Sequence, residues 1–456
     1  MILFSGRGEC VDNAVMAKTF RPYEPDQQLL LPPSLQEWLP AGHLVWFISE
    51  TVDQLDLGPI VEAYRDAGQG NLPYHPAMML KILIYGYTSG VFSSRRIASQ
   101  IEENVAFRVL AAGNMPDHRT ICRFREQHLE AFEHLFVQVV QIARGSGLVK
   151  MGTLAVDGSK IRANASKHKA MSYERMQQEE KRLGQEIRAL TSRAAKRDAA
   201  EDVEFGPDFR ENQLPEELQR REDRLAKIRE AKGRLEARKA EEAKAQDDRK
   251  PGADPPKHGG RPRQHPIGKP KPKDQENFTD PESRIMKDGG GAFQQCYNAE
   301  VAVDGEACII VAASVQQSAS DARALIPMVD QAKRNVGVRA EEVLADAGFA
   351  SEVNLKALER RKIKGFVALG RDGKAARTPN PEAHATKRMA ARLRSKRGRA
   401  KYKRRKHIAE PPFGWMKRVL GFRQFSLRGL LKVSGEFRLV CLALNLRRMA
   451  SRMQWA

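Results

Sequence analysis

Two aspartates in the chain stand where α/β proteins often place catalytic carboxylates. Asp157 ends the apolar run 153–156 and is followed by glycine, and Asp346 ends the apolar run 343–345. Carboxylates at the carboxyl ends of neighbouring strands lie at the edge of the sheet where such proteins usually bind substrate. A single aspartate of this kind could be only a turn residue. Two of them in one domain favour a site.

Glu410 is the third candidate, because it follows the most basic segment of the chain. Residues 377–407 contain thirteen lysines and arginines and a single acid. Pro411 follows directly, and proline is tolerated in the first turn of a helix, so we expect Glu410 near the start of a helix that continues to residue 420. Glu410 could simply charge that helix end. Its isolation in so cationic a segment favours a role beside a polyphosphate.

Three carboxylates of this kind suit phosphoryl transfer supported by two metal ions. Mg²⁺ prefers carboxylate, phosphate and water oxygens. Two such ions, roughly 3.5–4 Å apart, can activate the attacking oxygen and stabilise the leaving one. Nearby lysines and arginines bind phosphates without sequence preference. The sequence contains no P-loop, no glycine-rich nucleotide fingerprint and no serine–histidine–aspartate order that would favour another chemistry.

The composition favours a polyanionic partner. The chain has 456 residues and a net charge of +21, and 41% of its residues are hydrophobic, enough for buried cores. Its five cysteines include no close pair with metal-ligand spacing, which argues against a zinc ribbon and against a disulfide framework. Its apolar runs fall short of the ~20 residues that cross a bilayer. We therefore expect a cytoplasmic protein with no membrane partner.

The apolar periodicity changes several times along the chain. Helical spacing predominates in the first third, strand signals begin near residue 153, and heptad-like spacing marks 173–246. Residues 304–306 predict a hairpin turn between strands 293–303 and 307–315. We expect an N-terminal arm (1–42, with Met1 or Met16 as the true start), an all-helical domain (43–150), an α/β core (151–169 and 277–456), a helical hairpin insert (170–248) and a basic flexible linker (249–276). The basic turns of the helical domain could contact DNA or simply lie on packed helices.

Taken together, these segments resemble the DDE-type transposases of bacterial insertion sequences, in the branch with an N-terminal helical domain and a long insert after the first catalytic strand. The resemblance covers nearly the whole chain. It rests on these blocks: 73–76, 93–97, 116–121, 156–161 with 164–166, 297–299, 345–349, and 404–417 continued by 421–422 and 427–429. Each block alone is a weak signal, but together they are specific.

The resemblance implies an α+β multidomain protein with a ribonuclease-H-like catalytic core. Asp157, Asp346 and Glu410 would be its catalytic acids and the ligands of two Mg²⁺ ions, with Mn²⁺ as a substitute. Related transposases also carry a tyrosine–arginine–glutamate–lysine signature around the third acid. The matching positions are Tyr402, Arg405, Glu410 and Lys417, although Lys406 would fit the usual arginine-to-glutamate spacing better than Arg405.

The implied activity is cleavage and joining of double-stranded DNA at the ends of the protein's own insertion sequence. Arg405 and Lys417 would hold backbone phosphates of element and target DNA, and Arg95, Arg96 and Arg119 would recognise the terminal repeats. Because two ends must be brought together, we expect a homodimer working at the nucleoid. The alternatives are a ribonuclease-H-like nuclease or resolvase without joining activity, and a non-catalytic DNA-binding remnant.

Overall fold

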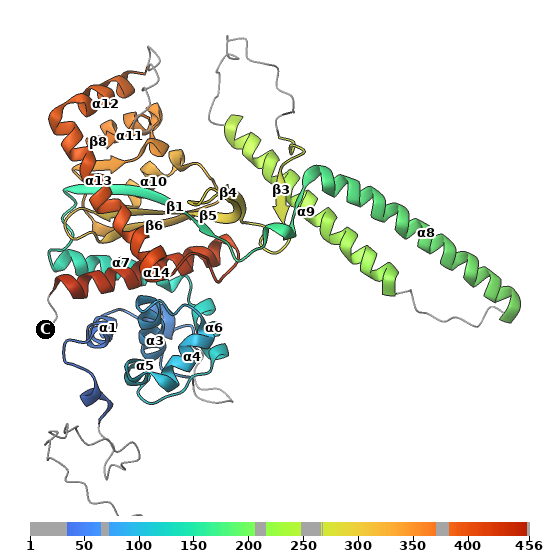
Figure 1. The fold of residues 1–456 in the computed structure, drawn as a ribbon, viewed down its shortest axis with the longest axis horizontal. Helices are drawn as coiled ribbons and strands as arrows, with labels where there is room; N and C mark the ends of the chain where they lie inside the picture. The colour runs from blue at the N-terminus through green and yellow to red at the C-terminus, as the bar shows by residue number, and fades with distance from the viewer. Residues whose placement is uncertain are drawn as a thin grey trace, which may run out of the picture.

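The computed structural model describes residues 34–64, 73–205, 216–247, 266, 268–370 and 383–453. A group of short helices at the N-terminus precedes a mixed β-sheet with helices on both faces, and two long helices project to one side (Figure 1). Most of the expected arm (1–42) and most of the expected linker (249–276) lie outside the described residues. Within the described part, no helix combines the length and apolarity needed to cross a membrane.

The described residues between 44 and 145 form only helices and loops. The helices are α1 (Leu44–Asp53), α2 (Gly58–Val61), α3 (Pro76–Thr88), α4 (Ser94–Glu103), α5 (Val105–Leu110), α6 (His118–Gln127) and α7 (Ala131–Gly145), preceded by the short η1 (Leu35–Trp38). Asp117 is the N-cap of α6, where its Oδ1 accepts a hydrogen bond from the backbone N–H of Thr120 at 2.7 Å. Helix α3 is buried on almost every side, which makes it the centre of this helical core.

The central sheet mixes antiparallel and parallel strands. Its strands are β1 (Thr153–Arg162), β4 (Arg284–Lys287), β5 (Phe293–Asp304), β6 (Ile310–Gln316), β7 (Glu342–Ala345) and β8 (Lys364–Val367). The order is β4-β5-β1-β7-β8, and β6 also pairs with β5. β5 is antiparallel to β1, β4 and β6, whereas β1, β7 and β8 are mutually parallel. The expected hairpin at residues 304–306 is confirmed by the β5–β6 pairing.

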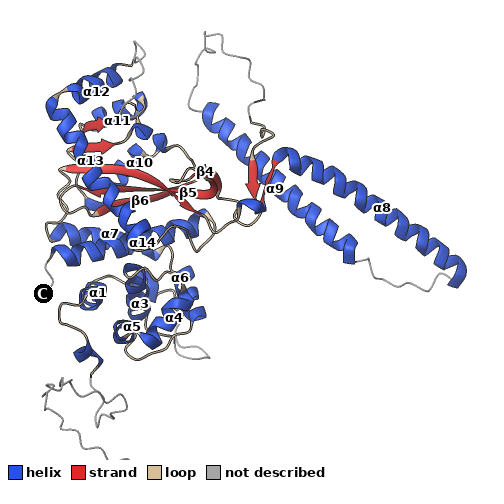
Figure 2. Cartoon of the chain, in the orientation of Figure 1, coloured by secondary structure: helices blue, strands red, loops and turns tan. Residues whose placement is uncertain are grey.

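Helices cover both faces of this sheet (Figure 2). They are η3 (Asp321–Arg323), α10 (Leu325–Val336), η4 (Ala347–Phe349), α11 (Glu352–Arg360), α12 (His384–Arg394), α13 (Lys396–Gly414), the π-helix η5 (Trp415–Val419) and α14 (Leu430–Arg452). Successive side chains of a strand point to opposite faces. Asp157 contacts α13, whereas Lys160 contacts η3, so α13 lies on one face and η3 with α10 on the other.

The expectation that Glu410 begins a helix is wrong. Helix α13 starts at Lys396 and continues through Pro411 and Pro412. Glu410 is the fifteenth residue of this helix. The two prolines remove the hydrogen bonds that His407 and Ile408 carbonyls would accept. The thiol of Cys308 lies 3.7 Å from the His407 oxygen and supplies a weak replacement donor. Burial of the inner face of α13 stabilises the helix despite this loss.

Two long antiparallel helices, α8 (Tyr173–Phe205) and α9 (Glu216–Asp247), stand apart from the sheet (Figure 1). Met176 and Leu183 of α8 pack with Leu225, Ile228 and Ala231 of α9. The pair is joined to the core through η2 (Lys167–Lys169) and a two-stranded sheet, β2 (Ala170–Ser172) with β3 (Gln275–Asn277). The last residues of the expected linker are therefore part of this small sheet.

A buried acid connects the N-terminal helices α1–α7 (44–145), called the helical segment below, to the part of the chain that contains the sheet. Glu436 of α14 is fully buried, and its carboxylate accepts hydrogen bonds from the N–H groups of Ser426 at 3.0 Å and Leu427 at 3.1 Å. Arg125 of α6 is also buried, and it donates to the carbonyl of Phe92 at 3.0 Å. The charge of Arg125 lowers the pKa of Glu436, although burial raises that pKa overall. Helix α6, the loop before α14 and α14 itself are thus held together by buried polar groups.

Candidate active site

Asp157 and Asp346 lie on adjacent parallel strands at the same level. Val156 of β1 pairs with Ala345 of β7, and the two aspartates are the next residues on each strand. Asp346 N-caps η4, where its Oδ1 accepts a hydrogen bond from the N–H of Gly348 at 2.8 Å. The sequence suggested that a strand ends at Asp157, but β1 does not end there. It continues to Arg162 against β5, and only its pairing with β7 stops at Val156.

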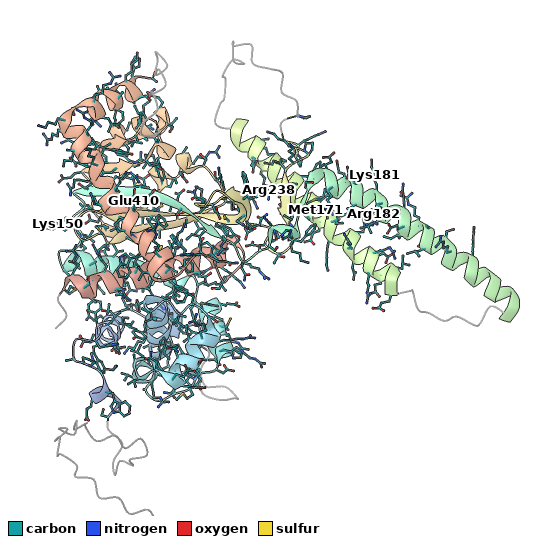
Figure 3. All side chains as sticks on the ribbon, viewed as in Figure 1. Lys150, Met171, Lys181, Arg182, Arg238 and Glu410 are labelled. Atoms are coloured by element: carbon teal, nitrogen blue, oxygen red, sulfur yellow. The ribbon has the colours of Figure 1, made fainter. Side chains whose placement is uncertain are left out.

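Glu410 approaches these residues from α13, on the face of the sheet that Asp157 shares (Figure 3). Arg405 lies between the two acids. Its Nη1 is 3.5 Å from Oδ2 of Asp157, and its Nη2 is 3.4 Å from Oε1 of Glu410. The Arg405 side chain is 12% exposed and that of Glu410 is 52% exposed, so the arginine is the buried member of this pair. Its guanidinium also lies 6.0 Å from the centre of the Tyr402 ring.

The electrostatics show that the three acids share one environment. Burial raises the pKa of Asp157 to about 6, Arg405 opposes that rise, and the charges of Asp346 and Glu410 add to it. Burial would lower the pKa of Arg405, but the charge of Asp157 raises it above its ordinary value. Burial therefore disfavours the ionised form of Asp157, and the guanidinium of Arg405 offsets only part of that effect.

The acids are close together but do not form a ready metal cage. Within the residues that the structure describes, no three His, Cys, Asp or Glu side chains are grouped so that they could hold a metal ion. At this site the guanidinium of Arg405 lies between the carboxylates of Asp157 and Glu410 and contacts both. Its contacts with the two carboxylates are longer than the usual 2.7–2.9 Å of a charged hydrogen bond, so it holds them loosely.

The two other cations of the expected signature lie differently. Lys417 of η5 donates hydrogen bonds to Oγ of Ser159 at 2.5 Å and to the carbonyl of Lys160 at 2.9 Å, so it is engaged with β1. Burial lowers its pKa. Lys406 is exposed and makes no ion pair with any described residue. The geometry therefore puts Arg405, and not Lys406, against the acids.

Sequence reasoning missed a polar cluster on the opposite face of β1. Asp321 of η3 accepts hydrogen bonds from Nζ of Lys160 at 2.8 Å and from Nδ2 of Asn298 at 2.7 Å. A Cβ on Gly158 would lie 3.3 Å from Oδ1 of Asp321, and a Cβ on Gly348 would lie 3.1 Å from its Oδ2. The signal in the sequence was the glycine that follows each of the two aspartates, one position after Asp157 and two positions after Asp346.

The three arginines expected to recognise DNA lie on two packed helices of the N-terminal segment. Arg95 and Arg96 are in the first turn of α4, and Arg119 is in the first turn of α6. All three are exposed.

Two family models match the chain. One, described as a transposase domain (DUF772), matches residues 33–127, which include all three exposed arginines. The other, described as a transposase DDE domain, matches residues 262–446, which include Asp346 and Glu410. The matches identify the protein as a transposase, and hence as an enzyme that processes DNA. The chain belongs to the DDE-type transposases of insertion sequences, a family that generally uses divalent metal ions. No curated protein and no solved structure shows a significant match.

Proposed function

We propose that this transposase cleaves and joins double-stranded DNA at the ends of its own insertion sequence by metal-dependent phosphoryl transfer. The observation that carries the proposal is that Asp346 and Glu410, from separate parts of the chain, both act electrostatically on Asp157. Asp157 and Asp346 follow a paired position of two parallel strands, and Glu410 is linked to Asp157 through Arg405. Helix-covered strands in a mixed parallel and antiparallel order support a ribonuclease-H-like core.

The donor chemistry of the site fits Mg²⁺, with Mn²⁺ as a substitute. Asp157, Asp346 and Glu410 offer only carboxylate oxygens, which hard divalent ions prefer. Burial raises the pKa of Asp157 and the charges of Asp346 and Glu410 add to the rise, so a bound cation would favour the ionised carboxylate. Such ions, two in the proposed mechanism, would activate the attacking oxygen and neutralise charge on the scissile phosphate. The loose contacts of Arg405 allow its guanidinium to turn from the carboxylates toward that phosphate.

The residues of the chain itself would position the DNA. Arg405 would bind a non-bridging oxygen of the scissile phosphate, because it is the buried cation beside Asp157. Tyr402 would support its guanidinium, and Lys406 would contact the backbone from the exposed side of α13. Lys417 would act less directly: its bonds to Ser159 and Lys160 hold η5 against β1, and thereby set the distance between Glu410 and Asp157.

The helical segment would recognise the terminal repeats. Arg95, Arg96 and Arg119 are exposed at the N-termini of α4 and α6, where backbone N–H groups also favour phosphates. Bringing two ends together requires two sets of these contacts, so we propose a homodimer as the active form, working on nucleoid DNA. The division of the chain after residues 42, 150, 169, 248 and 276 remains part of this proposal.

The test is incubation of the full chain with labelled end DNA, a supercoiled plasmid and Mg²⁺ or Mn²⁺, followed by a denaturing gel. A transposase of this kind should nick at the element end and join the 3′ end covalently to plasmid DNA. Nicking without joining would support the nuclease or resolvase alternative. DNA binding with no metal-dependent product would support a non-catalytic remnant.

A further inference from the structure

A row of cations on α13 leads away from Glu410. Lys396, Arg399, Lys403 and Lys406 follow one another at spacings of three, four and three residues, and Glu410 comes four residues later. Residues three and four apart lie on one face of an α-helix. All five side chains are exposed. The four cations, named here the α13 stripe, therefore form one solvent-facing line that ends at a proposed catalytic acid.

The α13 stripe lacks acidic partners among the described residues, since none of its four side chains takes part in an ion pair there. Two other cations nearby are paired. On α12, Arg388 contacts Glu359 at 2.6 Å. On the inner side of α13, Lys401 contacts Glu342 at 2.8 Å. Neighbouring like charges without counter-charges repel one another, and a bound polyanion would remove that repulsion. The stripe is thus complementary to a phosphate backbone.

The α13 stripe also has a direction relative to the helical segment. That segment contacts the chain just beyond α13 and η5, where the rings of Phe92 and Phe422 are 5.1 Å apart. Figure 1 shows α13 extending from this region toward α12. From Glu410 back to Lys396 is fourteen residues. At about 1.5 Å per residue this is about 21 Å, the length of roughly six base pairs at 3.4 Å each.

We propose that the α13 stripe binds the backbone of the donor DNA that flanks the element, while the helical segment holds the element's end. This inference rests on the proposed function, which puts the scissile phosphate at Glu410. DNA bound by the helical segment on one side of that phosphate is continuous with the flank on the other side. The stripe begins at the phosphate and extends in the flank's direction for the length of about half a helical turn of DNA.

The test compares binding to two DNA substrates that share one element end and differ only in the length of the flanking DNA. One flank has about 2 base pairs and the other about 15, so only the longer flank can cover the α13 stripe. The variant is Arg399→Gln/Lys403→Gln, and binding is measured without divalent metal. The matched control is Lys333→Gln/Arg334→Gln on α10, which removes the same charge from the opposite face of the sheet. Both control residues are exposed.

Wild type should bind the long-flank DNA more tightly than the short-flank DNA, and the stripe variant should lose that advantage. Each phosphate contact contributes about 0.9 to the slope of log affinity against log salt, so the slope for long-flank DNA should fall by about 1.8. The control variant should keep the wild-type difference.

Equal losses on both DNAs, or no loss on either, would overturn the proposal. An unchanged flank preference combined with impaired joining of a pre-cut end to plasmid would assign the stripe to target DNA instead, and would also overturn it. Failure of the proposed function is distinguishable, because it would leave wild type without any metal-dependent product whatever the flank length.

Discussion

The carboxylate of Asp321 lies directly against Gly348, two residues after Asp346. A Cβ at Gly348 would be 3.1 Å from Oδ2 of Asp321 and 3.0 Å from Oδ1 of Asp346. The other oxygen of Asp321 faces Gly158, the residue after Asp157. One carboxylate on the opposite face of the sheet thus fits into the space that two glycines leave, and it contacts the backbone just after both aspartates.

Adding a methyl group at Gly348 should therefore disturb catalysis more than folding. In Gly348→Ala, either Asp321 or Asp346 must move by a few tenths of an ångström, because both contacts are tighter than ordinary van der Waals packing. We expect DNA cleavage to fall about tenfold or more, since small misplacements of catalytic groups are costly. The melting temperature should change little because residue 348 is exposed. Gly152→Ala, with open space around its Cβ, is the control. Full cleavage activity in Gly348→Ala would show that Asp321 does not position the site.

Arg405 and Lys406 should differ sharply when substituted. Arg405 contacts Asp157 and Glu410, whereas Lys406 is exposed. Arg405→Gln should lower the cleavage rate by about 100-fold or more, as the loss of one buried transition-state donor does. Lys406→Gln should lower it only a few-fold, through weaker phosphate binding. Single-turnover cleavage at saturating enzyme separates the two effects. The reverse ranking would make Lys406 the cation of the family signature.

Glu300 should make folding stability depend on pH. It is fully buried on β5, and burial, with a contribution from Asp321, raises its pKa from 4.5 to about 8. The folded state therefore holds this proton more tightly than the unfolded state. Its contribution to stability is complete below about pH 4.5 and is lost as the pH rises to about 8.

The variant Glu300→Gln cannot ionise and should be more stable than wild type at pH 8.5, on the order of a few kcal/mol. The difference should shrink toward pH 5. Urea unfolding at both pH values checks this, with the exposed Glu306→Gln as a control. A difference that does not change with pH would mean that Glu300 stays charged in the folded protein.

Glu436 should be essential for holding the helical segment on the core. Glu436→Ala leaves the N–H groups of Ser426 and Leu427 without their acceptor and removes the charge that faces buried Arg125. We expect a loss of about 3–5 kcal/mol in unfolding free energy, as for other broken buried charge networks. Lys432→Ala on the exposed side of α14 should cost less than about 1 kcal/mol. Equal stability of the two variants in urea unfolding would contradict the structural role.

Much of the core could be predicted from local patterns. The apolar runs before Asp157 and Asp346 indicated buried strands, and the turn at residues 304–306 indicated the β5–β6 hairpin. These patterns are informative because buried central strands are apolar on both faces. In addition, only a few residue types favour hairpin turns. The two aspartates could therefore be assigned to buried strands without a structure, although β1 continues past Asp157 to Arg162.

The surroundings of Glu410 and the role of Asp321 could not be predicted in this way. Pro411 normally marks a helix start, and only packing of the inner face of α13 on the sheet overrides that preference. Asp321 directly follows Ser320, the N-cap of the short helix η3. A serine followed by an acid is common at helix starts, so the sequence did not indicate a role at the site. Its contacts with Lys160 and Asn298 arise from strand pairing across more than a hundred residues.

The central claim is that Asp157, Asp346 and Glu410 act together on one phosphate. Its most direct test is cleavage and binding of labelled end DNA by the three variants Asp157→Asn, Asp346→Asn and Glu410→Gln, with Mg²⁺ for cleavage and without metal for binding. The account predicts that every variant loses strand cleavage by several orders of magnitude and binds the end within a few-fold of wild type. Substantial cleavage by any one variant, or a loss of binding that parallels the loss of cleavage, would contradict it.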